Sequence, residues 1–125
     1  YEGEFSKNIR NGNGKIILSS SENIEGIFVD GVLKAITKGY LNENYYEGKI
    51  KNGCGKAKII YKDKSLYFGN IKNFMKNGFG TYYFDETNLN YYIGNWKNGK
   101  MHGNGIISQK NMKREGIWRF GKKIK

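Results

Sequence analysis

The side chains best suited to chemistry in this chain are His102 and Cys54, its only imidazole and its only thiol. An imidazole can act as a general base, and a nucleophilic thiol needs a neighbouring base to activate it. No such partner can be identified from the sequence, and the two residues alone cannot complete a four-ligand zinc site. We therefore interpret His102 as a turn or packing residue, and Cys54 as a small turn residue in a short loop.

Glutamate recurs immediately before a glycine, at Glu2, Glu25, Glu47 and Glu115. A carboxylate ladder could bind a metal, whereas solvent-facing carboxylates opposite lysines on neighbouring strands contribute only small pair energies. We favour the second interpretation. The Gly-Asn-Gly and Gly-Phe-Gly segments resemble phosphate-loop fragments, but no helix and no Lys-Ser/Thr pair follows them. The sequence predicts no enzymatic activity, no cofactor and no metal.

The composition indicates a β-rich chain with a basic surface. The 125 residues include 18 Gly, no Pro, 10 Tyr, 7 Phe and 2 Trp, and aromatic residues favour strands. The net charge of +11 suggests an acidic partner, an anionic membrane or nucleic acid. A genome biased toward A/T-rich codons would also enrich Lys, Asn and Ile. Nucleic acid is the least favoured partner, because no motif that recognises it is present.

Several features that the sequence lacks bear on the cellular location of the protein. No apolar run approaches the ~18 residues of a membrane span, and no signal peptide is visible. A single cysteine excludes an intrachain disulfide and agrees with a reducing compartment. We expect a cytoplasmic protein associated with the cytoskeleton or a membrane. We also expect a fragment, because Tyr1 already lies in a strand-like segment.

An internal repeat supplies the elements that position these residues. Six segments open with an aromatic residue or its substitute, followed by any residue and a glycine, and these glycines are 21 to 25 residues apart. The units begin near residues 1, 24, 46, 67, 92 and 114, and the last is partial. The whole chain is therefore one repeat array.

A second glycine motif follows each opening. In most units it has the form Gly-x-Gly, and in the second unit it is degenerate, with Ala35 and Thr37. In the third unit Gly55-Lys56-Ala57 comes two residues early, which predicts a shorter hairpin loop. Alternation with period two, and Asn-Gly turns between the arms, predict one β-hairpin per unit. The regular motifs are Gly12–Gly14, Gly78–Gly80 and Gly103–Gly105.

The predicted fold is all-β, an elongated single-layer antiparallel sheet of consecutive β-hairpins that pair edge to edge. We expect the small residues to leave gaps over which aromatic rings lie, because a Cβ there would clash with a ring. Some glycines are also expected to take positive φ at the bends. The structural glycines are Gly3, Gly26, Gly48, Gly69, Gly94, Gly103, Gly105 and Gly116.

The pattern resembles the MORN (membrane occupation and recognition nexus) repeat, Y-x-G-x-W-x-x-G-x-x-x-G-x-G. Residues 92–105, YIGNWKNGKMHGNG, fit this form at every position, and residues 1–14 fit with Phe5 for the tryptophan and Asn8 for the turn glycine. The resemblance covers nearly the whole chain and is weakest in the second unit. It implies a twisted single sheet with an aromatic groove, and non-catalytic roles in cytoskeletal, axonemal or membrane-contact scaffolds.

The repeat aromatics are predicted to line a groove that binds a partner. A single-layer sheet has no second layer to cover this face, and exposed apolar patches mark interfaces. We expect a protein segment or a second copy in the groove, and the resemblance also implies protein binding or homodimerisation. The groove residues are Tyr1, Phe5, Phe28, Tyr46, Ile50, Tyr67, Ile71, Tyr92, Trp96 and Trp118.

The alternative is peripheral binding to an anionic or phosphoinositide membrane through basic loops. Two loose groups of basic residues would carry it. The first group is Lys49, Lys51, Lys56, Lys58, Lys62 and Lys64, and the second is Lys110, Lys113, Arg114, Arg119, Lys122, Lys123 and Lys125.

Overall fold

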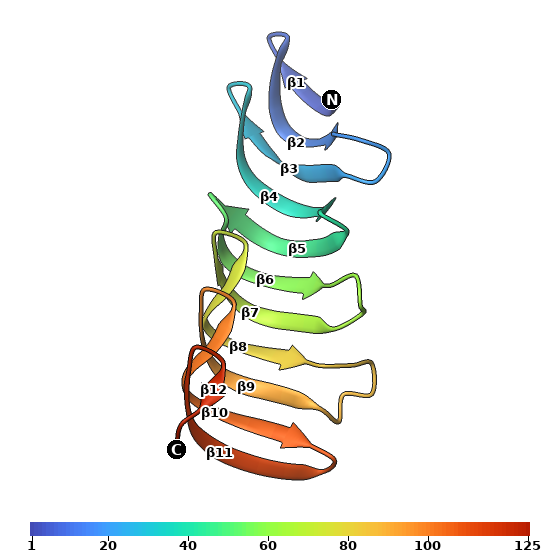
Figure 1. The fold of residues 1–125 in the computed structure, drawn as a ribbon. Coiled ribbons are helices and arrows are strands. Elements are labelled where there is room, and N and C mark those ends of the chain that lie inside the picture. The colour runs from blue at the N-terminus through green and yellow to red at the C-terminus, as the bar shows by residue number, and fades with distance from the viewer.

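The computed structural model describes residues 1–125 as twelve strands without a helix. The strands form one open sheet whose spatial order is the chain order, and each pair is antiparallel (Figure 1). The predicted fold class is confirmed. The strands are β1 (Glu2–Ser6), β2 (Ile9–Ile17), β3 (Asn23–Val29), β4 (Val32–Leu41), β5 (Asn44–Lys51), β6 (Cys54–Ile60), β7 (Leu66–Lys72), β8 (Met75–Tyr83), β9 (Tyr91–Lys97), β10 (Lys100–Gln109), β11 (Met112–Arg119) and β12 (Lys122–Lys123).

Each repeat unit covers one hairpin, from β1–β2 to β11–β12. A two-residue turn joins the strands of every hairpin, and both turn residues have positive φ, as in Asn52 (52°) and Gly53 (75°). This is the geometry of a type I′ turn, whose twist matches that of the flanking strands. Asn and Gly adopt it at little cost, which explains the recurrent Asn-Gly pairs.

The units differ in their bulges rather than in their turns. In hairpin β7–β8 the register shifts between the pairs Gly69–Gly80 and Ile71–Lys76, so β8 carries two extra residues. Hairpins β1–β2 and β9–β10 shift at the matching place, whereas β5–β6 keeps one register throughout. The predicted shorter loop in the third unit is wrong, because its turn at 52–53 has the usual length and the bulge is absent instead.

Successive hairpins are joined at their turns as well as along their strands. The amide N–H of Gly99 donates to the Lys76 carbonyl over 2.8 Å, and that of Asn98 donates to Asn77 Oδ1 over 3.1 Å. The same double contact recurs in the last hairpin, where His102 Nδ1 accepts from the Phe120 N–H over 3.2 Å. The turns at 30–31, 98–99 and 120–121 are tied to the preceding hairpin by two hydrogen bonds each, and the turn at 73–74 by one.

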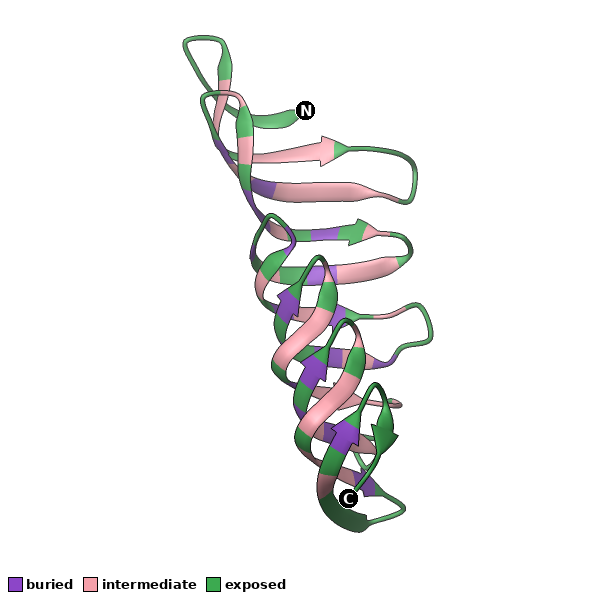
Figure 2. Cartoon of the chain, turned by 60° about the vertical axis from the view of Figure 1, so that its left-hand side comes forward, coloured by how far each residue is buried: buried purple, intermediate pink, exposed green.

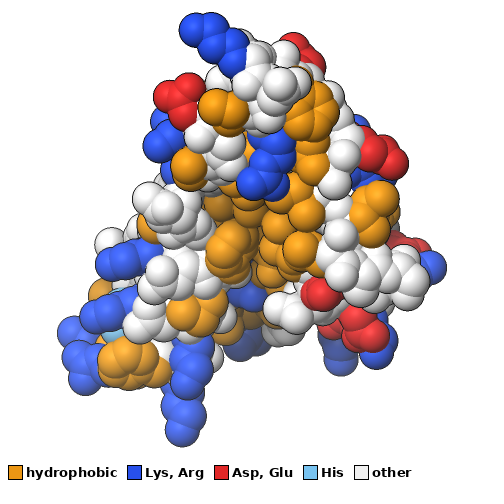
Figure 3. Space-filling view, turned by 90° about the horizontal axis from the view of Figure 1, so that it is seen from above, with side chains coloured by type: hydrophobic (Ala, Val, Ile, Leu, Met, Phe, Trp, Pro, Cys, Tyr) orange, Lys and Arg blue, Asp and Glu red, His pale blue; other side chains and the backbone are white.

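One face of the curved sheet carries the core. Seen along the stack, hydrophobic side chains gather in the hollow between the two sides of the sheet (Figure 3), and this is the concave face. Buried segments recur in successive hairpins, whereas β1 is exposed throughout (Figure 2). The core cluster consists of Ile36, Tyr46, Ile50, Ala57, Ile59, Tyr67, Ile71, Tyr92, Trp96 and Trp118.

The convex face carries the recurring glutamates. In the first three hairpins they stand opposite lysines: Glu25 pairs with Lys15 on one side and Lys38 on the other, and the Lys38 ammonium lies 3.5 Å from its carboxylate. Glu115 instead faces Ile106. The interpretation as solvent-facing partners of lysine therefore holds in the N-terminal hairpins, and the last glutamate departs from it.

Candidate functional site

The floor of the concave groove is built from tyrosines that lie over glycine pairs. A Cβ added at Gly105 would meet the Tyr92 ring at under 3.0 Å, and one at Gly80 would meet the Tyr67 ring equally closely. At Gly94 the nearest obstacle is instead the backbone of the neighbouring strand. Glycine in the two strands therefore lets a ring lie flat against the backbone.

The hydroxyl groups of these tyrosines are satisfied by their own units. Tyr67 Oη donates to the Asn70 carbonyl over 2.6 Å, and Tyr92 Oη donates to the Asn95 carbonyl over 3.1 Å. Both carbonyls lie where the hairpin changes register. Each tyrosine therefore holds the bulge of its own hairpin as well as covering the glycines.

Edge-to-face ring contacts connect one unit to the next. The Tyr92 ring centroid lies 5.0 Å from both Trp96 in its own unit and Trp118 in the following unit. Tyr67 contacts Trp96 at 5.8 Å, and Trp96 Nε1 donates to the Gly80 carbonyl over 3.1 Å. Such aromatic pairs stabilise by about 0.5–1.5 kcal/mol beyond the area they bury.

Most of the predicted groove residues lie under the surface of the groove. Eight of the ten are buried, and only Tyr1 (38% exposed) and Phe5 (61%) are open to solvent. The expectation that this face leaves these side chains uncovered is wrong for those eight, because the sheet curves and neighbouring side chains cover one another. The eight buried residues are Phe28, Tyr46, Ile50, Tyr67, Ile71, Tyr92, Trp96 and Trp118.

A second row of partly buried side chains packs on this floor and lines the accessible groove. Tyr61, Tyr82, Phe84, Met101 and Ile107 belong to it. Most of them come from the second strand of a hairpin or the residue after it. The predicted site does not include them, although the alternation after the second glycine motif places Tyr61, Tyr82 and Phe84 on the core face.

Two adjoining hollows open along the C-terminal half of the groove, and Phe84 lines both. The smaller, of about 240 Å³, includes Lys76, Tyr82, Trp96 and Met101 in its lining. The larger, of about 700 Å³, includes Ile107 and Trp118 in its lining. No Asp or Glu lines either hollow. Their basic residues are Lys76, Lys100, Lys110, Arg114 and Lys123.

Burial shifts the titration of several groups on this face. It raises the pKa of the hydroxyl groups of Tyr61, Tyr67 and Tyr92 above the ordinary value of 10.0. Desolvation lowers the pKa of the Lys76 ammonium, and the charge of Asp63 opposes that shift. The largest cause of each of these shifts is burial rather than a catalytic pair.

The two residues first considered for chemistry lie apart from any catalytic arrangement. The His102 ring packs on Phe120 at 4.9 Å while its Nδ1 fixes the last turn. Cys54 is exposed at the first position of β6, not in a loop as expected. The structure contains no group of three His, Cys, Asp or Glu side chains that could hold a metal ion.

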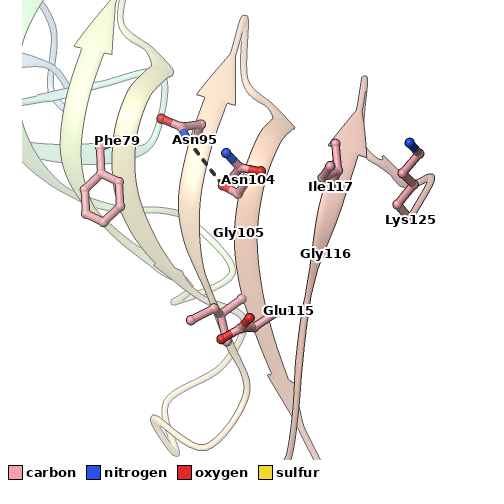
Figure 4. A pocket seen from close by; sticks show the side chains of 9 residues that line it. Phe79, Asn95, Asn104, Gly105, Glu115, Gly116, Ile117 and Lys125 are labelled. Carbon is pink, nitrogen blue, oxygen red and sulfur yellow. Dashed lines mark hydrogen bonds between the residues drawn. The ribbon is translucent and has the colours of Figure 1, made fainter.

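The convex face has a shallow hollow of its own (Figure 4). It is lined by Phe79, Asn95, Asn104 and Ile117 among others, and Asn95 Nδ2 donates to the Asn104 carbonyl over 3.4 Å. Its floor includes the backbone of Gly105 and Gly116. The titratable residues in its lining are Glu115 and Lys125. This hollow is more open and carries less charge than the concave groove.

The fold and its groove define a class of protein: an open β-hairpin repeat that presents an aromatic concave face. The MORN repeat family model matches residues 1–21, 67–86 and 92–111. The chain therefore carries MORN repeats. Such repeats are generally non-catalytic modules that bind proteins or membranes. No helix of this structure has the length and apolar character needed to cross a membrane.

Curated relatives share about half of the chain. Alsin of Rattus norvegicus is 33% identical over 73 residues, 54% of this chain and 4% of that protein, and Alsin of Homo sapiens is 32% identical over the same length. MORN repeat-containing protein 3 of Xenopus laevis is 38% identical over 72 residues, 52% of this chain and 30% of that protein. The chain thus spans a small part of the relatives it matches.

Proposed function

We propose that this chain is a non-catalytic interaction scaffold whose concave groove binds a segment of a partner protein. The observation that carries the proposal is the lining of the two hollows, which combines aromatic and aliphatic side chains with five basic residues and no acidic one. Aromatic residues contribute contact area with few rotors to immobilise. A continuous groove of this composition fits an extended or helical polypeptide that carries negative charge.

A bilayer and a second copy fit this groove less well. A bilayer surface is nearly flat and cannot enter a concave face, and the basic residues Lys49, Lys56 and Lys58 of the membrane alternative lie on the convex face. A second copy would bring its own charge of +11 to a basic groove. Both remain outcomes of the experiment below.

Selection from a random-peptide display library on the 125-residue chain tests the proposal. Selected peptides should lose binding to Phe84→Asp, which places a charge between the two hollows. They should keep binding to Phe79→Asp, the matched change on the exposed convex face. Circular dichroism and thermal melts establish that both variants remain folded.

Two further measurements cover the alternatives. Sedimentation with phosphatidylcholine–phosphatidylserine vesicles should leave the chain in the supernatant at physiological salt, and analytical ultracentrifugation should report a monomer. Peptides whose binding is equally insensitive to both variants would overturn the groove proposal. Vesicle binding that is abolished by salt or by charge reversal at Lys122, Lys123 and Lys125 would replace it with the membrane alternative.

A further inference from the structure

Lys76 is half-buried among three aromatic rings that come from three successive repeat units. Its Nζ lies 4.6 Å from the ring centroid of Tyr82, 4.7 Å from that of Tyr61 and 5.2 Å from that of Trp96. Nζ also donates to the Tyr61 hydroxyl over 3.4 Å. The ammonium is therefore held in one place by the groove rather than extended into solvent.

No carboxylate of the chain lies within 4.0 Å of this ammonium, and the charge of Asp63 acts on it only from a greater distance. The ion pairs within 4.0 Å are Lys38–Glu25, Lys62–Glu43 and Lys64–Glu86, all of them among exposed side chains. Ring faces attract a cation but leave its charge in place. A partly desolvated ammonium with no directly paired carboxylate gains more from an incoming carboxylate than a hydrated surface lysine does, because the local dielectric constant is lower.

The cage is open to a ligand on its groove side. Lys76 lines the smaller hollow together with Tyr82, Phe84 and Met101. The hollow, of about 240 Å³, is smaller than the roughly 300–1,000 Å³ of pockets that enclose drug-sized molecules. Its size suits a few side chains of a polypeptide, with apolar contacts around a single charge.

The equivalent position differs between units. The position is the second residue after the hairpin turn, and the residues that stand there include Lys76 opposite Ile71, Arg10 opposite Phe5, Met101 opposite Trp96 and Lys123 opposite Trp118. Met101 supplies no charge, and Arg10 lies over the Tyr1 and Phe28 rings at 5.6 and 5.4 Å in the exposed first unit. Lys123 is exposed, so within the C-terminal half of the groove only Lys76 places a cation at this position over aromatic rings.

We infer that Lys76 anchors an Asp or Glu side chain of the partner segment, flanked by apolar side chains that contact Phe84 and Met101. This rests on the proposed function and adds the chemistry of the partner. The carboxylate forms a charge-assisted hydrogen bond with Nζ inside the ring cage. The remaining basic residues of the groove add a less specific attraction for acidic chains.

The peptides selected on the wild-type chain provide the probe. Those that depend on Phe84 should contain Asp or Glu beside apolar residues, and replacing that acid by its amide should weaken binding to the wild-type chain about tenfold or more. Lys76→Met should bind the acid and the amide peptides equally. Lys76→Arg should retain the preference, as should Lys72→Met, a control on the exposed side of β7.

Each result decides one of the two proposals. Groove-dependent peptides that contain no acidic residue, or whose acid-to-amide change has no effect on the wild-type chain, would overturn the inference and leave the scaffold function intact. The same holds if folded Lys76→Met keeps the full preference for the acid. The peptide substitution is measured on the wild-type chain, so it decides the question even where a Lys76 variant does not fold. Failure to select any groove-dependent peptide would overturn the scaffold function itself.

Discussion

At the scale of single residues, the groove depends on the absence of a Cβ atom at particular glycines. The Tyr92 ring occupies the space that a Cβ of Gly105 would need, whereas a Cβ at Gly94 would strike the backbone of the adjacent strand. These two glycines face each other in the ladder between β9 and β10. Gly105 makes room for a ring, and Gly94 allows two backbones to approach closely. Removing the ring should therefore change the cost of substituting Gly105 more than the cost of substituting Gly94.

Gly105→Ala should destabilise the chain by about 1–3 kcal/mol, the usual cost of overpacking. In a Tyr92→Leu background the additional cost should become small, because the ring that the new methyl group meets has gone. Gly94→Ala should keep most of its cost with Leu at position 92, because its two nearest obstacles are backbone atoms and the Tyr92 hydroxyl is only the third. Urea unfolding of the single and double variants measures both couplings.

The control for this cycle is Gly99→Asn. A Cβ at Gly99 meets no atom within 4 Å, and its φ of 82° lies in the region that Asn tolerates. The free energy of unfolding should therefore change little. If Gly105→Ala costs the same in both backgrounds, the ring is not the reason for this glycine.

At the scale of elements, the hairpin turns are tied to one another by a repeating pair of hydrogen bonds. In each pair, two backbone N–H groups of a turn donate to the preceding hairpin. One acceptor is the carbonyl of the residue two positions before the glycine motif, and the other is the side chain of the next residue. Lys76 and Asn77 accept in this way from the turn at 98–99. His102 takes the place of the asparagine in the fifth unit. A histidine therefore serves this role because a neutral ring nitrogen can accept a hydrogen bond.

Asn77→Ala should remove one of these ties and cost about 1 kcal/mol, the typical net value of one hydrogen bond. The amide of Asn98 should lose protection against hydrogen exchange, whereas the amide of Phe120, tied through His102, should keep it. His102→Ala should give the opposite pattern. Exchange followed by NMR distinguishes the two, and unchanged protection of both amides would show that the side chains do not fix the turns.

At the scale of the whole molecule, the main contacts of each strand are with its two neighbours in the chain. Stability is then close to a sum of unit and interface contributions. The tyrosine hydroxyl groups buried along the concave face, including those of Tyr61, Tyr67 and Tyr92, belong to several of these interfaces. Their protonation therefore bears on the whole stack.

Stability should fall at alkaline pH. The pKa of these tyrosines is raised in the folded chain, so the folded state keeps protons that the unfolded chain releases near pH 10. Their contribution is fully present below about pH 10 and is lost as pH rises through the raised values. Thermal melts by circular dichroism across this range should show falling melting temperatures, and Tyr67→Phe should make the fall shallower.

The matched control is Tyr40→Phe, because Tyr40 lies exposed on β4. It should leave the alkaline fall as steep as in the wild-type chain. The same series in high salt accounts for the effect of lysine deprotonation. If the melting temperature then stays constant well above pH 10, the assignment to buried tyrosines is contradicted.

Much of the sheet could be predicted from the sequence, because both of its causes are local. Period-two alternation sets the strands, and pairs such as Asn52-Gly53 and Asn98-Gly99 set type I′ turns. The missing bulge of the third unit was not predictable, since a unit two residues shorter is compatible with either a shorter turn or a straighter strand. The choice depends on the pairing of β5 with β6, which the spacing alone does not determine.

The predicted groove residues lie deeper in the sheet than the sequence indicates. Tyr67, Tyr92 and Trp96 lie on the concave side, yet they are buried, because the curvature of the sheet brings each ring against the next. Curvature is a property of many strands together and has no signature within one unit. The accessible row that includes Tyr82 and the ring cage around Lys76 could not be predicted either, because both are formed by side chains of different units that meet only in the stacked sheet.

The agreement between strand order and chain order also has a mechanical consequence. The backbone hydrogen bonds between neighbouring strands run along the stack, so tension applied along it loads these ladders one after another rather than all at once. The array should yield by unzipping strand by strand at low force, unlike sheets that are sheared along their strands. Each hairpin released would lengthen the chain in a discrete step, and the hairpins still stacked would keep their share of the groove.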